Sequence, residues 1–450
     1  MLPLALSSCN QQKPNIIWLM AEDIGNDLGC YGRTDLQTPV LDQLAADGIQ
    51  YNRAYCTNPI CSPSRSAMMT GMYQTTIGAE HHRSHRDDGF HLPGPVKPIT
   101  TYLRQAGYFC ALGCGFGKKT DLNFQVDTPL FDGNDWSKRK PGQPFFAQIQ
   151  LAVTHRGKWW EKTRTESPHP VNPDSVILPP YIPDHPLTRY DWALYLDQLE
   201  KADSQTGELL QRLDDEGIAN NTIVIFIGDN GRCHVRGKGF LYEDGIKVPL
   251  IIRWPDGIKK GQVSEQLVSM IDVSAQILDW AGVTLPDYLQ GKPFMGANAV
   301  TRNFVFAARD RWDEVYDKIR TVIGTRYKYI RNDMPERGWT FQQDYVERVR
   351  PMYPVIRKLI AEGKTTPEQE WFFLPQKPKE ELYDLQEDPW ELHNLADDPE
   401  HRFVKENLKK KLETWEVETN DQGRYPEKES AIPKRWRKKV REREAQATNS

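Results

Sequence analysis

The 450-residue sequence lacks any apolar run near the roughly 20 residues that a helix needs to cross a bilayer. It also lacks an excess of positive charge, because 58 Lys and Arg residues face 62 Asp and Glu residues. This balance excludes general affinity for nucleic acid, so any recognition of anions must come from a few well-placed cations. An apolar fraction of 38% is typical of a soluble protein.

Cysteine is scarce, with seven residues in the whole chain. None of them has the doubled Cys-x-x-Cys spacing of a structural zinc site. Most are therefore interpreted as buried free thiols, which pack like small apolar side chains. Internal repeats and low-complexity blocks are also absent, so two or three ordinary domains account for the length.

Four apolar segments alternate with helical patterns in the first 300 residues. The apolar segments lie at residues 15–21, 145–153, 222–227 and 248–254. The helical patterns lie at residues 38–48, 100–107 and 190–217. Continuous apolar runs of this length are typical of strands that are buried on both faces of a parallel sheet. The alternation predicts an α/β domain over residues 14–300, with a large, doubly wound, mostly parallel sheet flanked by helices.

The character of the sequence changes after residue 300. Residues 303–308 and 319–330 predict strands of a small antiparallel sheet, and residues 399–418 predict a helix. The polar stretch 334–379 predicts long loops with one helix. Residues 433–450 are dense in charge and predict a solvated helix or a frayed tail. Together these segments predict a smaller C-terminal α+β domain over residues 301–450.

One short segment carries the strongest chemical signal. Cys61-Ser62-Pro63-Ser64-Arg65 opens a helical pattern, with Pro63 where a first helical turn tolerates proline. The N–H groups and dipole of a helix N-terminus favour an anion, and Arg65 lies on the same face as Cys61. We interpret Cys61 as a reactive atom at the edge of an anion pocket. The alternative is a half-buried cysteine beside a solvated arginine.

Oxygen-bearing side chains follow two of the predicted strands. Glu22 and Asp23 come after the first, and Asp229 and Asn230 come after the strand at 222–227. The carboxyl ends of parallel strands form the edge where open α/β sheets bind ligands. Such oxygens suit calcium, or magnesium with added waters, and do not suit zinc. The alternative is two independent turns, because Asp-Asn-Gly is a common turn sequence.

The Cys-x-Pro-x-Arg pattern at 61–65 resembles the signature of the type I sulfatases of the alkaline phosphatase superfamily. The resemblance runs from Pro14 to about Leu395 and includes Asp-Asn-Gly at 229–231 and Glu-Leu-Tyr-Asp-Leu at 381–385. It implies that Cys61 is oxidised to formylglycine (3-oxoalanine), whose hydrate attacks sulfur with the help of Arg65. It also implies a Ca²⁺ ion, or Mg²⁺. The implied metal ligands are Glu22, Asp23, Cys61, Asp229 and Asn230. Glu22 departs from the aspartate that is usual at its position.

The resemblance further implies three catalytic groups around the sulfate. Lys119 falls in the Gly117–Phe124 segment, His155 ends its strand, and Lys238 lies in a glycine-rich loop. Lys238 or His155 would protonate the leaving alcohol. Asp121 stands where the commoner motif has a histidine, so it is expected to contact the substrate instead. A lone histidine after a strand is otherwise a capped turn residue.

The similar sequences are bacterial heparan N-sulfatase-like enzymes and sulfatases of algal polysaccharides. This implies a sulfated polysaccharide or its oligosaccharides, such as ulvan, as substrate, with an N-sulfoglucosamine as the alternative. The expected substrate contacts are His81, His82, Arg83, Asp121, Arg236 and Arg311. Further candidates are His85, Arg86, Arg309, Asp310, Asp313 and Glu314. The alternative is that these are solvated loops.

Two other classes of protein stay open at this point. A phosphatase or phosphonate hydrolase of the same superfamily would share the fold and the metal edge. A glycan-binding lipoprotein without catalysis would keep the cationic pocket and retain Cys61 as a thiol.

The first residues, which end in Leu6-Ser7-Ser8-Cys9, resemble the end of a bacterial lipoprotein signal, in which the cysteine becomes the lipidated first residue after cleavage. We expect residues 1–13 to be a signal remnant and the enzyme to reside in the bacterial periplasm or on the outer membrane, held by a lipid at Cys9. A chance match is the alternative. The expected protein partner is a formylglycine-generating or anaerobic sulfatase-maturing enzyme. With Cys9 and Cys61 modified, five cysteines remain, so at least one is unpaired.

Overall fold

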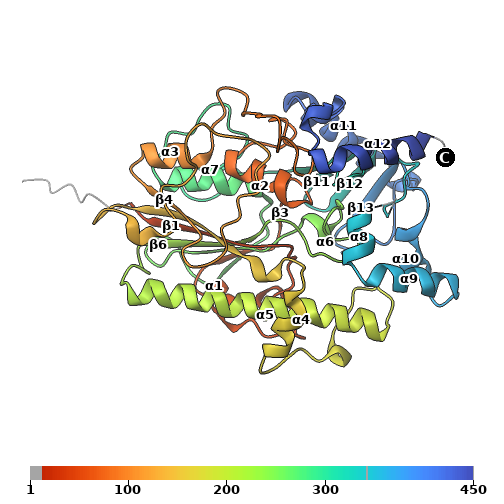
Figure 1. The fold of residues 1–450 in the computed structure, drawn as a ribbon, viewed down its shortest axis with the longest axis horizontal. Helices are drawn as coiled ribbons and strands as arrows, with labels where there is room; N and C mark the ends of the chain where they lie inside the picture. The colour runs from red at the N-terminus through yellow and green to blue at the C-terminus, as the bar shows by residue number, and fades with distance from the viewer. Residues whose placement is uncertain (1–12, 341–342, 449–450) are drawn as a thin grey trace, which may run out of the picture.

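A seven-stranded sheet forms the centre of the larger part of the computed structural model, which describes residues 13–340 and 343–448 (Figure 1). The strand order is β4-β5-β1-β6-β7-β2-β8. The strands are β1 (Asn15–Ala21), β2 (Ile49–Tyr51), β4 (Phe109–Leu112), β5 (Phe145–Leu151), β6 (Thr222–Gly228), β7 (Leu250–Arg253) and β8 (Gln262–Ser264). A separate pair, β3 (Ala54–Tyr55) and β9 (Val268–Ser269), lies beside it. The predicted α/β sheet is confirmed.

Strand β1 is an internal strand of this sheet, third in the strand order. It pairs in parallel with β5 on one side and β6 on the other, so that Ile17 lies opposite both Ala147 and Val224. All seven residues of β1 are buried, as its continuous apolar run predicts. The predicted strand at 248–254 is present as β7, but it runs antiparallel to β6. The sheet is therefore mixed and mostly parallel.

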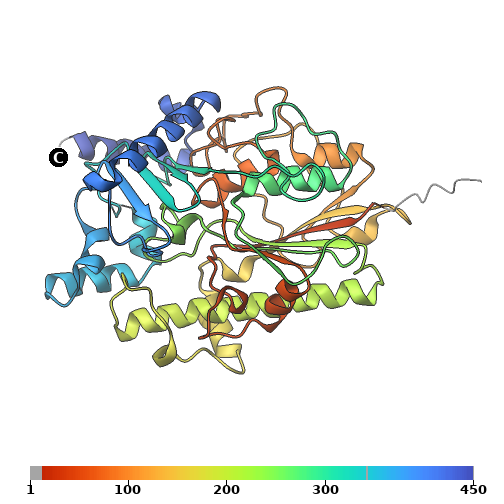
Figure 2. The same cartoon turned by 180° about the vertical axis from the view of Figure 1, so that it is seen from behind.

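Helices cover both faces of the sheet. They are α1 (Pro39–Ala46), α2 (Cys61–Thr70), α3 (Ile99–Gln105), α4 (Trp159–Glu166), α5 (Pro186–Asp215), α6 (Glu243–Ile246) and α7 (Met270–Trp280). Figures 1 and 2 show α1, α4 and α5 on one face and α2, α3 and α7 on the other. The three helices predicted from periodicity correspond to α1, α3 and α5. Helix α5 begins at Pro186, behind the N-cap His185, whose ring accepts a hydrogen bond from the Leu187 N–H.

The C-terminal part contains the predicted antiparallel sheet, in the order β10-β11-β12-β13. Its strands are β10 (Val305–Arg309), β11 (Ile319–Ile323), β12 (Tyr327–Asn332) and β13 (Glu380–Asp384). Helix α11 (Arg402–Glu418) packs on it, with Trp415 stacked on Phe306 at 5.2 Å between ring centroids. The region 334–379 holds α8 (Asp344–Val349), α9 (Met352–Ala361) and α10 (Pro367–Glu370), where one helix was expected. The predicted domain boundary near residue 300 falls between α7 and β10.

The charged C-terminal segment forms helix α12 (Lys434–Thr448). It is held to α8, because Lys439 and Arg443 each form an ion pair with Asp344 at 2.6 and 2.9 Å. Within the helix, the side chain of Val440 is buried. The helix alternative of the prediction is therefore the correct one for this segment.

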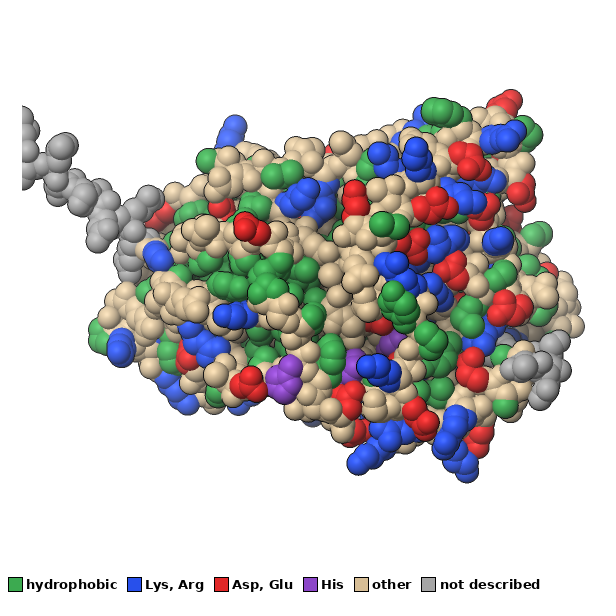
Figure 3. All heavy atoms as spheres, turned by 90° about the horizontal axis from the view of Figure 1, so that it is seen from above, with side chains coloured by type: hydrophobic (Ala, Val, Ile, Leu, Met, Phe, Trp, Pro, Cys, Tyr) green, Lys and Arg blue, Asp and Glu red, His purple; other side chains and the backbone are tan. Residues whose placement is uncertain are grey.

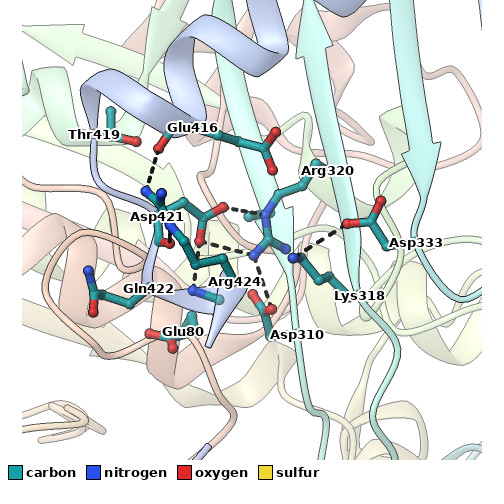
Figure 4. Close-up of polar contacts among 12 residues, drawn as sticks. Glu80, Asp310, Lys318, Arg320, Asp333, Glu416, Thr419, Asp421, Gln422 and Arg424 are labelled. Atoms are coloured by element: carbon teal, nitrogen blue, oxygen red, sulfur yellow. Dashed lines mark hydrogen bonds and ion pairs between the residues drawn. The ribbon is translucent and has the colours of Figure 1, made fainter. Parts of the chain in front are cut away.

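The chain before α12 is anchored by a buried ion-pair network, which Figure 4 shows in close-up. Arg320 on β11 donates from Nε to Asp421 at 2.6 Å and from a terminal nitrogen to Asp310 at 3.1 Å. All three side chains are buried. Six residues further on, Glu427 accepts two hydrogen bonds from Arg311, at 2.6 and 2.8 Å. These pairs fix the C-terminal segment against β11 and the loop that follows β10.

Cys30, Cys56, Cys61, Cys110, Cys114 and Cys233 are all free thiols in the described ranges, and five of the six are buried. This agrees with the interpretation of most cysteines as packed apolar side chains. The expected signal remnant at residues 1–13 lies outside the described residues except for Lys13. No helix among those described is both long and apolar enough to cross a membrane.

Candidate active site

The ends of β1 and β6 bring the two oxygen-bearing pairs together. Since Ala21 and Gly228 are partners in the parallel ladder, the residues that follow them meet at one edge of the sheet. The Asp23 N–H donates to Asp229 Oδ1 at 3.0 Å, and Asn230 Nδ2 donates to Asp23 Oδ1 at 3.0 Å. Asp23 adopts a left-handed conformation with φ of 54°, a strained backbone state that is common at functional sites.

Cys61 is the first residue of α2 and faces this acidic edge. Its sulfur lies 3.7 Å from Asp23 Oδ1 and accepts a hydrogen bond from Lys238 Nζ at 3.1 Å. Burial raises the pKa of the Cys61 thiol to about 12, although Lys119 and Lys238 lower it. The unmodified side chain is therefore a neutral thiol at neutral pH and a weak nucleophile.

Lys238 bridges Cys61 and Asp23. Its ammonium group donates to both carboxylate oxygens of Asp23, at 2.7 and 2.9 Å. Burial lowers the pKa of Lys238, but the charge of Asp23 outweighs this and raises it well above its usual value. Burial likewise raises the pKa of Asp23, and Lys238 with His155 outweighs burial and lowers it. Both groups are therefore charged in the folded protein.

Arg65 is buried one helical turn after Cys61 and is held from three directions. Its Nε donates to Asp229 at 2.8 Å, and a terminal nitrogen donates to the side-chain oxygen of Gln150 at 2.6 Å. The other terminal nitrogen donates to the carbonyl of Lys119 at 3.1 Å. The charge of Asp229 outweighs burial and raises the pKa of Arg65. The guanidinium group is thus fixed beside the acidic edge.

Gln148 and Gln150 were missed by the sequence reasoning. Both lie on β5 and are buried. Gln150 accepts from Arg65, and Gln148 Nε2 donates to the carbonyl of Lys119 at 3.1 Å. Two polar residues inside an otherwise apolar strand were the available signal, because buried amides need partners.

Lys119 and His155 form the more open side of the site. Lys119 forms an ion pair with Glu22, and its ammonium group lies 3.8 Å from Asp121. The Nε2 atom of His155 lies 3.9 Å from Glu22, and its ring stacks on Trp159. Their side chains are 24% and 27% exposed, whereas Glu22 is 2% exposed. Burial lowers the pKa of His155, which favours the neutral imidazole.

The oxygen donors of this edge fit a divalent cation. Glu22, Cys61 and Asp229 each have one possible ligand atom within 4.8 Å of those of the other two residues. The Oδ1 atom of Asn230 is buried and has no hydrogen-bond partner among the described residues. An unpartnered buried oxygen beside carboxylates is what a hard cation would satisfy. The predicted ligand residues are therefore together in space.

Arg236 and Arg311 were expected to contact the substrate, but both side chains lie in the interior of the structure. Arg236 is buried among Tyr181, Tyr242 and Trp371 and donates to the carbonyl of Glu391. The Arg311 guanidinium is fully buried and is occupied by Glu427. Because neither guanidinium group reaches solvent, neither is placed to meet a sugar chain.

His81 and His82, which were expected to contact the substrate, are also largely internal. His82 Nδ1 lies 2.9 Å from Asp313, and His81 Nδ1 accepts a hydrogen bond from the Arg311 N–H at 3.2 Å. Both are 6% exposed. Burial lowers the pKa of each ring. They support the loop after α2, and their contacts with Asp313 and Arg311 join it to the loop that follows β10.

Arg83 and Asp121 line a pocket next to the site, with a volume of about 490 Å³. The same pocket is lined by Arg86 and Asp87 and by the start of α12, at Lys434 and Arg435. The basic residues at 434–439 were the sequence signal for this wall, and they were interpreted as part of a solvated helix or a frayed tail. Only the folded chain brings it beside Asp121.

Comparison with known families agrees with this geometry. The Sulfatase family model matches residues 14–117 and 109–283, and the model "N-sulphoglucosamine sulphohydrolase, C-terminal" matches residues 231–340. An ulvan-active sulfatase of Formosa agariphila is 35% identical over 472 residues, which cover 94% of this chain and 78% of that protein. The human N-sulphoglucosamine sulphohydrolase is 26% identical, with 93% of each chain covered.

Solved structures share the fold at low sequence identity. A 2-O GAG sulfatase superposes with a TM-score of 0.66 at 19% identity, covering 92% of this chain and 94% of that one. A structure in complex with D-glucosamine-2-N,6-O-disulfate gives a TM-score of 0.64 at 18% identity, covering 91% and 98%. The matched family model spans more than half of the chain and contains every residue of the acidic edge and Cys61. The chain therefore belongs to the sulfatase family and is a sulfuric ester hydrolase.

Proposed function

We propose that this enzyme removes sulfate esters from a sulfated polysaccharide or its oligosaccharides, with a formylglycine made from Cys61 as the nucleophile. The observation that carries the proposal is the position of Cys61 at the N-terminus of α2, 3.1 Å from Lys238 and beside the acidic edge of Asp23 and Asp229. A buried neutral thiol has little use there as a nucleophile, whereas an aldehyde hydrate would face the cation and the lysine.

Two groups complete this site. A hydrated aldehyde at position 61 would supply two hydroxyl groups on one carbon, one to attack sulfur and one to release the sulfate afterwards. A Ca²⁺ ion held by Glu22, Asp23, Asp229 and Asn230 would stabilise negative charge on the attacking oxygen and on the sulfate. Mg²⁺ is the alternative cation. The oxygen-rich donor set supports a hard cation, and the unpartnered Asn230 oxygen supports its place.

The cationic side chains orient and neutralise the sulfate group. Lys238 already carries a proton within hydrogen-bond distance of position 61. Lys119 and His155 lie at the more exposed side, where a sulfate ester would enter. Fixed cations such as Lys119 and Lys238 stabilise charge that develops in the transition state without having to reorganise. The leaving alcohol takes its proton from Lys238, or from His155 when its imidazole is protonated.

The substrate class follows from the relatives. Two ulvan-active sulfatases of Formosa agariphila are 35% and 31% identical to this chain, which supports an algal polysaccharide such as ulvan. The second candidate is an N-sulfoglucosamine, supported by the C-terminal family model at 231–340 and by the human relative. Sulfate release from ulvan oligosaccharides and from N-sulfoglucosamine, measured side by side, separates these candidates.

The test of the nucleophile uses mass spectrometry and turnover together. The peptide that contains position 61 is expected to be about 18 Da lighter than its cysteine form, and Cys61→Ser is expected to lose sustained turnover. An intact thiol in fully active protein would contradict the proposal. Aryl phosphate assayed beside aryl sulfate tests the phosphatase alternative, which requires the phosphate to be the better substrate.

We further infer that a formylglycine-generating or anaerobic sulfatase-maturing enzyme acts on Cys61, and that the protein works in the periplasm or at the outer membrane. The Leu6-Ser7-Ser8-Cys9 sequence supports a lipid anchor. Metabolic labelling with a fatty acid and fractionation of the producing cells test this. Labelling that persists in a Cys9→Ala variant would contradict the anchor.

A further inference from the structure

The pocket beside Asp121 carries a surplus of positive charge. Four cations line it, namely Arg83, Arg86, Lys434 and Arg435, against the two carboxylates of Asp87 and Asp121. Arg86 donates to Asp121 at 2.7 Å, and Arg83 lies 3.7 Å from the same oxygen. The side chains of Lys434 and Arg435 form no ion pair with any carboxylate of the described ranges. Two cations are therefore left for a ligand.

The surplus of positive charge is confined to the neighbourhood of this pocket and is not a property of the whole chain. Over the C-terminal elements, Figure 3 shows Lys and Arg side chains interspersed with acidic ones, and the whole chain has a formal net charge of −4. Burial lowers the pKa of Arg86, and the nearby charges of Arg83 and Arg435 lower it further, while Asp121 raises it. Mutual repulsion of this kind is relieved when an anion binds.

The pocket adjoins the catalytic centre. The Arg83 N–H donates to the hydroxyl of Ser62 at 2.7 Å, so Arg83 is tied to the residue that follows Cys61. On the other side, Asp121 lies 3.8 Å from Lys119. Arg83 and Asp121 both adopt left-handed backbone conformations, with φ of 53° and 52°. Strained residues persist where the surrounding structure fixes them, and they gather at binding sites.

The C-terminal wall of the pocket is fixed in place by the fold. The His85 N–H donates to the carbonyl of Ala431 at 2.9 Å, and the Lys434 N–H donates to Asp87 at 2.9 Å. The Arg320–Asp421 pair anchors the same chain segment further upstream (Figure 4). Lys434 and Arg435 are thus presented by a preorganised segment.

We propose that Arg83, Arg86, Lys434 and Arg435 form a second anion-binding subsite, which selects substrates that carry another negative group beside the sulfate that is cleaved. The inference rests on the proposed function, since it assigns a subsite next to the same centre. A volume of about 490 Å³ accommodates a small polar group such as one sugar unit. Arginine forks recognise planar carboxylates and sulfates through paired hydrogen bonds. The ligand group is a uronate carboxylate or a second sulfate.

The test compares substrates that share one scissile sulfate. The first carries a uronate carboxylate on the neighbouring sugar, the second carries that sugar reduced to the neutral alcohol, and the third carries a second sulfate. The double variant Lys434→Gln/Arg435→Gln is expected to lose about 10-fold or more in kcat/KM on one or both anionic substrates, mainly through KM. It should keep its rate on the neutral substrate and on an aryl sulfate. The anionic substrate whose kcat/KM falls shows whether the subsite binds a carboxylate or a second sulfate.

A matched control lies on the same helix. Lys438 and Arg441 are exposed on α12 outside the pocket, and Lys438→Gln/Arg441→Gln removes the same charge. Equal losses in the two double variants, or an equal loss on neutral and anionic substrates, would overturn the subsite. Unchanged kinetics on all substrates would overturn it as well. Failure of the proposed function shows separately, as absence of aryl sulfate hydrolysis by the parent enzyme.

Discussion

The ammonium group of Lys238 lies 3.1 Å from the sulfur of Cys61 and within 2.9 Å of both carboxylate oxygens of Asp23. Asp23 is 38 positions and Lys238 is 177 positions from Cys61 in the chain. One buried cation therefore ties the proposed nucleophile to the proposed metal edge. Its charge is held there by Asp23 and is available to a sulfate oxygen.

Removing the ammonium group of Lys238 should lower the rate of sulfate ester hydrolysis. Lys238→Met is expected to lower kcat/KM on an aryl sulfate by about 10²–10³-fold, because a fixed transition-state donor is lost. The rate is measured together with the formylglycine content by mass spectrometry, so that failed maturation is recognised. Lys162→Met, at an exposed position of α4, serves as the control. A fully matured Lys238→Met enzyme with normal rates would rule out this role.

Metal removal should act on stability as well as activity. Dialysis against a chelator is expected to lower the melting temperature. Adding Ca²⁺ at 100 times its Kd should raise the free energy of unfolding of the metal-free protein by about 2.7 kcal/mol. Asn230→Ala should shift the Ca²⁺ titration of the melting temperature to higher concentration. The exposed Asn298→Ala provides the comparison. A melting temperature that does not respond to chelator or to Ca²⁺ would argue against a bound cation.

Arg236 should affect folding and not substrate binding. Arg236→Leu removes a cation packed against three aromatic rings and is expected to destabilise the protein by about 2–4 kcal/mol. The KM for oligosaccharides should stay unchanged, because the buried Arg236 side chain does not line the pocket beside Asp121. Urea unfolding and steady-state kinetics measure the two effects. A raised KM without loss of stability would restore the substrate role expected from the sequence.

The Arg311–Glu427 pair should make stability depend on acid pH. Burial raises the pKa of Glu427, but His81, Arg311 and Tyr316 outweigh it and lower the pKa from 4.5 to about 2. Since the folded pKa is depressed, the stabilisation of about 3 kcal/mol is complete above pH 4.5 and is lost as the pH falls toward 2.

Comparing the parent protein with Glu427→Gln by urea unfolding at pH 7 and pH 3 checks this dependence. The difference in unfolding free energy between the two proteins should shrink at pH 3. An equal difference at both pH values would show that Glu427 titrates normally in the folded state.

Strands β1, β5, β6 and β7 were predictable from their apolar runs, because a strand buried on both faces is mostly apolar, whereas the shorter β2, β4 and β8 were not predicted. For the same reason the polar residues after β1 and β6 stood out as candidates for the site. The antiparallel direction of β7 was not predictable, since its apolar run reads the same in either direction. The interior position of Arg311 was not predictable for a related reason. Its partner Glu427 lies 116 residues away, and no local pattern indicates which charged side chains will be buried.

The sequence by itself determined the chemistry of this enzyme, since Cys61, Arg65 and the acidic strand ends occur in a pattern that few other functions require. Tertiary structure alone decided which cations line the pocket beside Asp121. Arg236 and Arg311 are turned inward by aromatic and acidic partners, whereas Lys434 and Arg435 are brought to the pocket from the far end of the chain. The physical reason is that burial of a charge depends on distant partners, while strand ends and helix starts are set locally.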